Sequence, residues 1–110
     1  MAIMQEPTFA ILTALAQGPR HGYAIITDAA EVSGGSVRLQ PGTLYAALDR
    51  LAGEGLVEVS GEEIVNGRLR RSYRLTSDGL AILDVEARRR QALASSALHR
   101  LRATTKAVAS

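Results

Sequence analysis

The chain has 110 residues, which suits a single domain, and it combines 46% hydrophobic residues with a net charge of +2 and no cysteine. The lack of cysteine excludes disulfides and thiolate metal sites, and no apolar run approaches the roughly 18 residues that a membrane span needs. We therefore expect a cytoplasmic protein with no signal peptide, membrane contact, metal or cofactor.

The charge is unevenly distributed along the chain. Residues 1–63 carry three arginines and eight acidic residues, a net charge of −5, whereas residues 64–110 carry nine arginines and one lysine against three acidic residues, a net charge of +7. A basic segment is a candidate surface for an anionic partner, although an arginine-rich face can also be a merely solvated one. The position of the arginines in the fold distinguishes a binding surface from a solvated face.

The first predicted helix begins near Pro7, which suits a first turn, and ends before Gly18-Pro19. Its apolar residues cover more than one stripe, so it must be covered on most sides. One small domain seldom has enough other helices and strands to cover a helix on most sides. We therefore expect part of this helix to pack on a second copy of the chain.

Two more helices follow. The second, over residues 21–33, ends at Gly34-Gly35, and its predicted buried stripe is Tyr23, Ile26 and Ala30, with Ala29 as a further candidate. The third begins at Pro41 and ends in the GEGL segment at 53–56. Its predicted buried stripe is Leu44, Ala47, Leu48 and Leu51, at spacings of three and four.

The hydrophobic period then changes from helical to two. Residues 56–64 and 68–76 both alternate apolar with polar side chains, and Asn66-Gly67 between them is a strong signal for a two-residue hairpin turn. Three helices followed by a hairpin is the order of a winged helix. The predicted fold class is therefore mainly α with a small β-hairpin: a winged helix-turn-helix plus a C-terminal helix.

A last helix is predicted from about Ser77 into the 100s, with Thr76 as its cap. Its apolar residues recur at roughly heptad spacing, interrupted by Arg90, and the helix would be about 38 Å long, too long for a small domain to cover. We expect residues 1–75 to form a DNA-binding domain and residues 76–110 a dimerisation helix with a frayed tail. The predicted dimer contacts, some from the first helix, are Phe9, Leu12, Leu80, Leu83, Ala87, Ala94, Leu98 and Leu101.

The outward face of the third helix suits DNA. Gly42 and Ala46 remove bulk, so the backbone can approach a duplex and the Ala46 methyl can touch a thymine methyl. Thr43 and Tyr45 can present hydroxyls to a phosphate or a base edge, and the free amides of the first turn suit a phosphate. Arg50, nearer the flank, is a candidate for a backbone oxygen. The competing interpretation is an ordinary amphipathic helix with a surface tyrosine.

The returning strand of the hairpin makes the wing basic, which favours DNA. Arg68 and Arg70 share one face of this strand and Arg71 lies on the other, so the first two are the favoured contacts. A wing beside a recognition helix follows the phosphate backbone or enters the minor groove, whose negative potential attracts arginine. Arginines that only keep an edge strand soluble are the alternative.

Other chemistries fit the sequence poorly. His21 and Tyr23, at the start of the second helix, are lesser candidates for a phosphate contact, because a lone histidine is more often a cap or a packed ring. No acidic or thiolate residue stands at metal-ligand spacing from His21 or His99. There is no nucleophile motif and no carboxylate pair at a pocket-like break, so we do not expect an enzyme.

Several motifs together resemble the PadR family of bacterial transcriptional regulators. They are an HGY turn, a PGTLY helix start, an EGLVE strand entry and an RxYxLT return strand, and they lie within "LTALAQGPRHGYAI", "LQPGTLYAALDRLAGEGLVE" and "GRLRRSYRLTSDGLAIL", roughly residues 8–83. The resemblance implies a winged-helix DNA-binding domain, a homodimer made by the C-terminal and N-terminal helices, and repression relieved by a small molecule. It also implies DNA contacts by Thr43, Tyr45, Arg68 and Arg70, with His21 and Tyr23 as lesser candidates.

Two departures from the family pattern bear on specificity. Gln40 stands where serine is common and Ala46 where proline is common, and a glutamine can read an adenine edge. The tail matches the short type, with one dimerisation helix. It has no aromatic residue after Tyr73, whereas members that bind planar drugs between the subunits use rings on the last helix.

The sequence thus predicts a homodimeric transcriptional repressor that reads a pseudo-palindromic operator, with its recognition helices roughly 34 Å apart. The expected partners are double-stranded DNA, a second copy of the chain and an unidentified small-molecule effector. The alternative is a winged-helix effector-sensing or protein-interaction module without specific DNA binding, which a neutral or acidic helix-wing face would mark.

Overall fold

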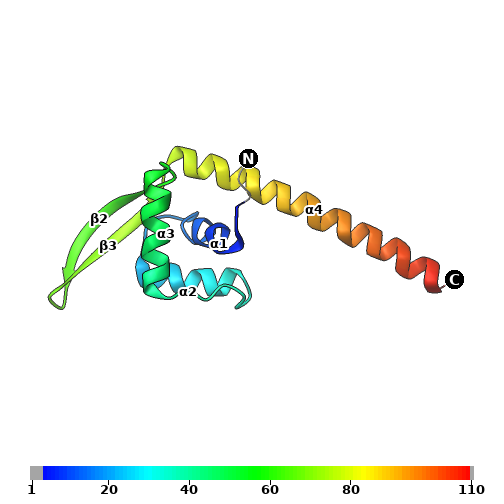
Figure 1. The fold of residues 1–110 in the computed structure, drawn as a ribbon, viewed down its shortest axis with the longest axis horizontal. Coiled ribbons are helices and arrows are strands. Elements are labelled where there is room, and N and C mark those ends of the chain that lie inside the picture. The colour runs from blue at the N-terminus through cyan, green and yellow to red at the C-terminus, as the bar shows by residue number, and fades with distance from the viewer. Residues whose placement is uncertain (1–3, 110) are drawn as a thin grey trace.

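The computed structural model describes residues 4–109 (Figure 1). Three helices precede a hairpin, and a long helix follows it, which confirms the predicted order of a winged helix. The sheet is antiparallel in the order β1-β3-β2. The elements are α1 (Glu6–Ala14), β1 (Arg20–His21), α2 (Gly22–Val32), α3 (Pro41–Gly53), β2 (Val57–Val65), β3 (Arg68–Leu75) and α4 (Ser77–Ala109).

The hairpin forms at the predicted turn. Asn66 and Gly67 both have positive φ, 52° and 76°, as a two-residue turn between strands of normal twist requires. The register that follows pairs Val65 with Arg68, and a bulge lies between Val59 and Gly61. The two-residue strand β1, which pairs with Ser72 and Tyr73, was not predicted because two residues show no periodicity.

The core forms where α1, α2, α3 and the base of the hairpin meet. Leu44, Leu48 and Leu51 of α3 are fully buried, which confirms the predicted stripe, and Ala47 is partly buried at its edge. The stripe predicted for α2 holds for its further candidate Ala29 and in part for Ile26, which is partly buried against the core, but it is wrong for Tyr23. Ile25 and Ala29 are fully buried, whereas Tyr23 is 69% exposed. With isoleucine at both 25 and 26, the sequence alone did not decide which one is fully buried in the core.

Helix α1 is covered mainly by its own chain, because it packs against both α2 and α4 (Figure 1). Leu12, expected at a dimer contact, is fully buried in the core of one protomer and so offers no surface to a second copy. Phe9 is half-buried, with the Arg90 guanidinium 4.4 Å from its ring centroid.

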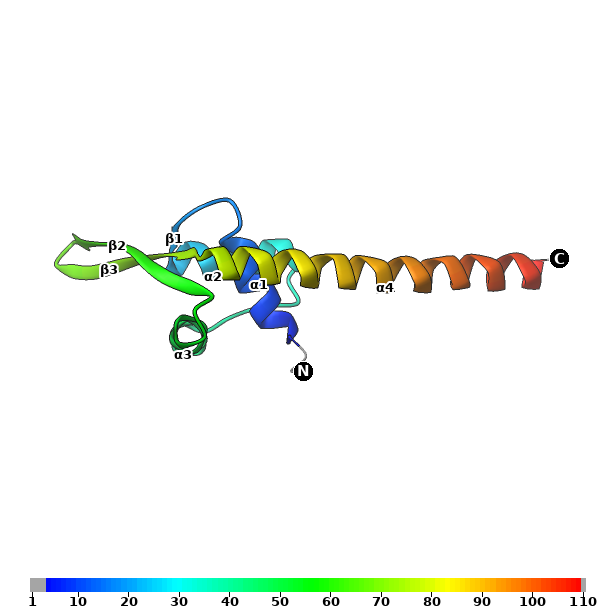
Figure 2. The ribbon, with the colours of Figure 1, turned by 90° about the horizontal axis from the view of Figure 1, so that it is seen from above.

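Helix α4 starts as predicted and then leaves the body of the protein. The Thr76 hydroxyl accepts a hydrogen bond from the Gly79 amide at 3.0 Å and donates one to the Gly55 carbonyl at 2.6 Å. With 33 residues the helix is about 50 Å long, and its far end and the hairpin project from opposite ends of the molecule (Figure 2). Leu83 packs against the core, whereas every side chain from 91 to 108 is exposed.

Arg90, which interrupts the apolar spacing of α4 in the sequence, joins this helix to the N-terminal part of the chain and to α1. Its Nη2 donates to the Met4 carbonyl at 2.7 Å, and its Nε donates to Glu86 at 3.2 Å. Arg89 also donates to Glu86, at 2.7 Å, and this hydrogen bond is the main reason why the pKa of the Glu86 carboxyl falls from 4.5 to about 2. We call Met4, Phe9, Glu86 and Arg90 the α1–α4 clasp.

The Glu86 carboxyl, held by Arg89 and Arg90, makes stability depend on pH. A carboxyl group whose pKa is lowered by folding stabilises the folded state above its unfolded pKa, here 4.5, and this stabilisation is lost as the pH falls toward about 2. Glu86→Gln should therefore lower the free energy of unfolding at pH 6 and match wild type near pH 2, as measured by urea titration at fixed protein concentration. Glu31→Gln, at an exposed position of α2, is the control, and a deficit of Glu86→Gln that persists at pH 2 would contradict the assignment.

Candidate nucleic-acid interface

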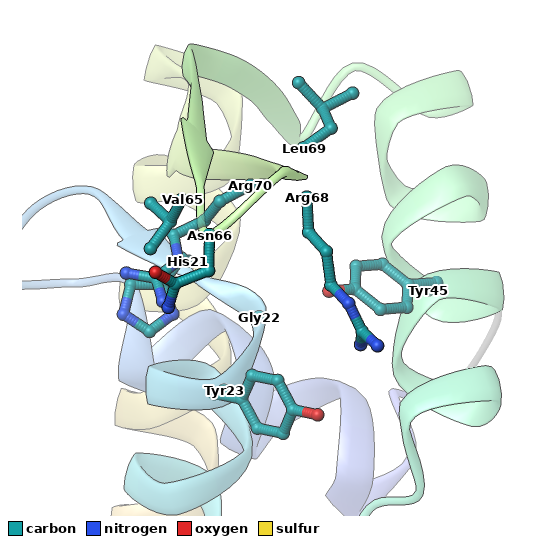
Figure 3. Close-up of a pocket in the computed structure, with 9 residues that line it drawn as sticks. All are labelled: His21, Gly22, Tyr23, Tyr45, Val65, Asn66, Arg68, Leu69 and Arg70. Atoms are coloured by element: carbon teal, nitrogen blue, oxygen red, sulfur yellow. The ribbon is translucent and has the colours of Figure 1, made fainter.

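The start of α2, the middle of α3 and the tip of the hairpin enclose an open cleft of about 460 Å³ (Figure 3). The helices stand on two sides, and the hairpin turn reaches over the space between them. The residues that line the cleft are His21, Gly22, Tyr23, Tyr45, Val65, Asn66, Arg68, Leu69 and Arg70. Five of the predicted DNA contacts, from three separate segments, therefore meet in one place.

The α3 side of the cleft follows from the burial of the leucines. Because Leu44 and Leu48 face the core, Thr43, Tyr45 and Ala46 must face outward, and all three are exposed. Gln40 is at the N-cap position, and its side chain makes no capping hydrogen bond. The exposed first turn of α3, with the positive end of the helix dipole, suits an anion.

Tyr45 and Arg68 approach each other across the cleft. Tyr45 is 43% exposed, and the side chain of Arg68 extends from the hairpin into the space between the Tyr45 and Tyr23 rings (Figure 3). His21 is half-buried next to the turn and pairs with Ser72 in the sheet, without capping α2 through its side chain. A hydroxyl, an imidazole and a guanidinium thus surround one hollow.

Arg50 lies away from this cleft. It forms an ion pair with Glu54 at 3.4 Å and donates a hydrogen bond to the Thr8 hydroxyl at 3.0 Å. Its guanidinium therefore links the end of α3 to the start of α1.

The wing is far less basic than its arginines suggested, because β2 supplies a carboxylate opposite three of them. Between Val57 and Leu75 there are four arginines and three glutamates, a net charge of +1. The ion pairs are Arg70–Glu63 at 3.9 Å, Arg71–Glu62 at 3.0 Å and Arg74–Glu58 at 2.8 Å.

Arg68 is different, because the register places Val65 opposite it. Within residues 4–109 no carboxylate pairs with Arg68. The sequence contained the signal for this arrangement. A two-residue turn at Asn66-Gly67 pairs 65 with 68, 63 with 70 and 62 with 71, so the acidic partners could have been found by counting outward from the turn.

Tyr73 lies at the base of the hairpin and belongs to the core. Its side chain is buried, and this burial raises the pKa of its hydroxyl; Tyr73 is not among the residues that line the cleft.

No other chemistry is visible in the part of the chain that the structure describes. Its His, Asp and Glu side chains include no group of three placed to hold a metal ion. Among the same residues, no helix combines the length and the apolar character that crossing a membrane requires.

Fold and cleft together define a winged-helix protein with a long C-terminal helix. Residues 11–85 match the model of the "Transcriptional regulator PadR-like family", which is more than half of the chain. The chain therefore belongs to the PadR-like family of transcriptional regulators, as the motifs indicated. Membership in a family of regulators agrees with the expectation that the protein is not an enzyme.

Individual relatives agree with this assignment. A transcriptional regulator of Mycobacterium tuberculosis is 44% identical over 68 residues, which are 62% of this chain and 63%, less than two-thirds, of that protein. The crystal structure of a PadR family regulator from Clostridium difficile has a TM-score of 0.70 at 24% identity and covers 88% of this chain and 99% of its own, which shows the fold. Bacillus subtilis PadR in complex with operator DNA has a TM-score of 0.63 at 26% identity over 73% of this chain and 45% of its own.

The ion pairs of the wing should limit its affinity for polyanions. Glu63→Gln frees Arg70, which lines the cleft, so this variant should elute from a heparin column at higher salt than wild type. Glu31→Gln removes the same charge from an exposed position of α2 outside the cleft and should shift elution less. Equal elution of the two variants would show that net charge, and not the wing, governs binding.

Proposed function

We propose that this protein is a sequence-specific DNA-binding transcriptional repressor that acts as a homodimer on a pseudo-palindromic operator in the cytoplasm. The observation that carries the proposal is the cleft, in which the exposed Tyr45 of α3 and the unpaired Arg68 of the wing face the same space. The operator complex of Bacillus subtilis PadR, a protein of similar fold, supports it.

In this proposal α3 enters the major groove. Gly42 and Ala46 let the helix backbone approach the duplex, Thr43 and Tyr45 supply hydroxyls, and Gln40 is positioned to read an adenine edge. The amides at the start of α3 bind a phosphate.

The wing binds the sugar-phosphate backbone or the adjacent minor groove. Arg68 is available without breaking an ion pair, whereas Arg70 and Arg71 must first exchange Glu63 and Glu62 for a phosphate. Exposed pairs of this kind contribute only about 0–1 kcal/mol each, so the exchange costs little.

The homodimer forms along the exposed half of α4. Leu93, Leu98 and Leu101 are all more than half exposed, and Ala94 and Ala97 lie between them at helical spacing. Leu80 and Ala87 are exposed nearer the body, whereas Leu83 already packs on its own core. This division leaves the distal leucines as the main contacts, with Phe9 at the margin. A small-molecule effector has no assigned site on this helix.

Arg68 and Tyr45 can be tested by DNA titration across salt concentrations, with fragments from around the protein's own gene. Arg68→Ala should weaken binding and flatten the slope of log K against log salt by about 0.9, the value for one lost phosphate contact. Tyr45→Ala should weaken binding with the slope unchanged, because it removes no charge.

Arg88→Ala is the matched control for Arg68→Ala, since it removes one arginine from α4 at a position with 76% side-chain exposure. Equal slopes for wild type, Arg68→Ala and Arg88→Ala would refute the role of the wing. A wild-type protein that retains no fragment above the level of random DNA would favour the protein-interaction alternative.

The dimer has its own test. Leu98→Asp combined with Leu101→Asp should give a monomer in sedimentation equilibrium, because each change places a charge where apolar surface is to be buried. Ser96→Asp, on the opposite side of the same helix, is the control and should remain a dimer. A double variant that sediments as wild type would exclude this face of α4 as the interface.

A further inference from the structure

The first residue of α2 is a glycine against which the Tyr45 ring packs. Gly22 is buried, and a Cβ added there would meet the Tyr45 hydroxyl oxygen at a distance that real Cβ atoms essentially never show. The same Cβ would lie 3.0 Å from Cζ and 3.4 Å from Cε1 of Tyr45. All three nearest atoms belong to the Tyr45 side chain. The absence of a side chain at Gly22 therefore makes room for the Tyr45 phenol and not for a core residue.

The backbone does not explain why position 22 is glycine. Its φ lies outside the left-handed range, unlike those of Gly34, Gly55 and Gly67. In α3, a Cβ at Gly42 or Gly53 would meet nothing within 4 Å. Close approach of another side chain therefore distinguishes Gly22 from the glycines of α3.

The contact determines where the phenol stands. The Tyr45 ring lines both the cleft with Arg68 and a smaller hollow of about 60 Å³, which Gly22, Tyr23, Ile26 and Pro41 also line. Without this contact, a tyrosine on an exposed helical face would populate several rotamers. Resting the end of the ring on Gly22 selects one of them before any ligand binds, which reduces the entropy lost on binding.

We propose that Gly22 is a positioning residue for DNA recognition: by leaving room for the end of the Tyr45 ring, it holds the phenol hydroxyl beside Arg68, so that both meet the same stretch of duplex. This inference rests on the proposed function. It adds to the DNA-binding surface a residue that affects binding although it has no side chain to contact DNA.

The test is a double-mutant cycle between Gly22→Ala and Tyr45→Phe, measured as DNA affinity at one salt concentration. Gly22→Ala should weaken binding by about tenfold, the order expected for one displaced hydrogen bond to a charged group. In the Tyr45→Phe background the same change should cost clearly less, because the atom nearest to the new methyl is gone. Gly53→Ala, a methyl added in open space on α3, should bind as wild type.

Two results would overturn the inference while the proposed function stands. One is unchanged affinity of Gly22→Ala. The other is an equal loss in the wild-type and Tyr45→Phe backgrounds at unchanged thermal stability, since Gly22 would then act by another route. Failure of the wild type to bind any DNA would refute the proposed function instead.

A measurement without DNA keeps the inference testable even if Gly22→Ala does not fold. In the NMR spectrum of wild type, the Gly22 α-protons should show nuclear Overhauser contacts to the Tyr45 ring and a ring-current shift that disappears in Tyr45→Leu. Absence of both signals in wild type would refute the contact itself.

Discussion

The rest of the structure depends on one packing constraint: α3 must bury Leu44, Leu48 and Leu51 against α1, α2 and the base of the hairpin. Each such leucine contributes about 1.5–3 kcal/mol by leaving water, so the helix cannot rotate about its axis without a large loss. The outward direction of Thr43 and Tyr45 is a consequence of this burial. The surface that we propose for DNA is thus held in place by the core behind it.

The electrostatic character of the wing comes from strand pairing and not from the local density of arginine. Glu62 and Glu63 lie in the strand before the turn, and the register returns Arg71 and Arg70 to them. Because such exposed pairs are weak, they lower the affinity for any polyanion without preventing a phosphate from replacing the carboxylate. Arg68 lies opposite Val65, so no carboxylate across the hairpin lowers its affinity for a phosphate.

Helix α4 has two parts with different surroundings. Up to Arg90 it packs on its own domain, and the side chains from 91 to 108 are exposed. The α1–α4 clasp lies at the boundary and ties α4 to the first helix just before the exposed half begins. In a dimer formed along that half, the clasp would therefore set the distance between the two α3 helices.

The sequence by itself determined the helices, the hairpin turn, the leucine stripe of α3 and the family, because periodicity, turn residues and motifs are local signals. It also contained the acidic partners of Arg70 and Arg71, which follow from the length of the turn. Only the tertiary structure decided that Ile25 faces the core, that Tyr45 rests on Gly22, and that Arg90 reaches a carbonyl 86 positions away in the chain. Each of these depends on which segments pack together, and no local pattern specifies a contact between distant segments.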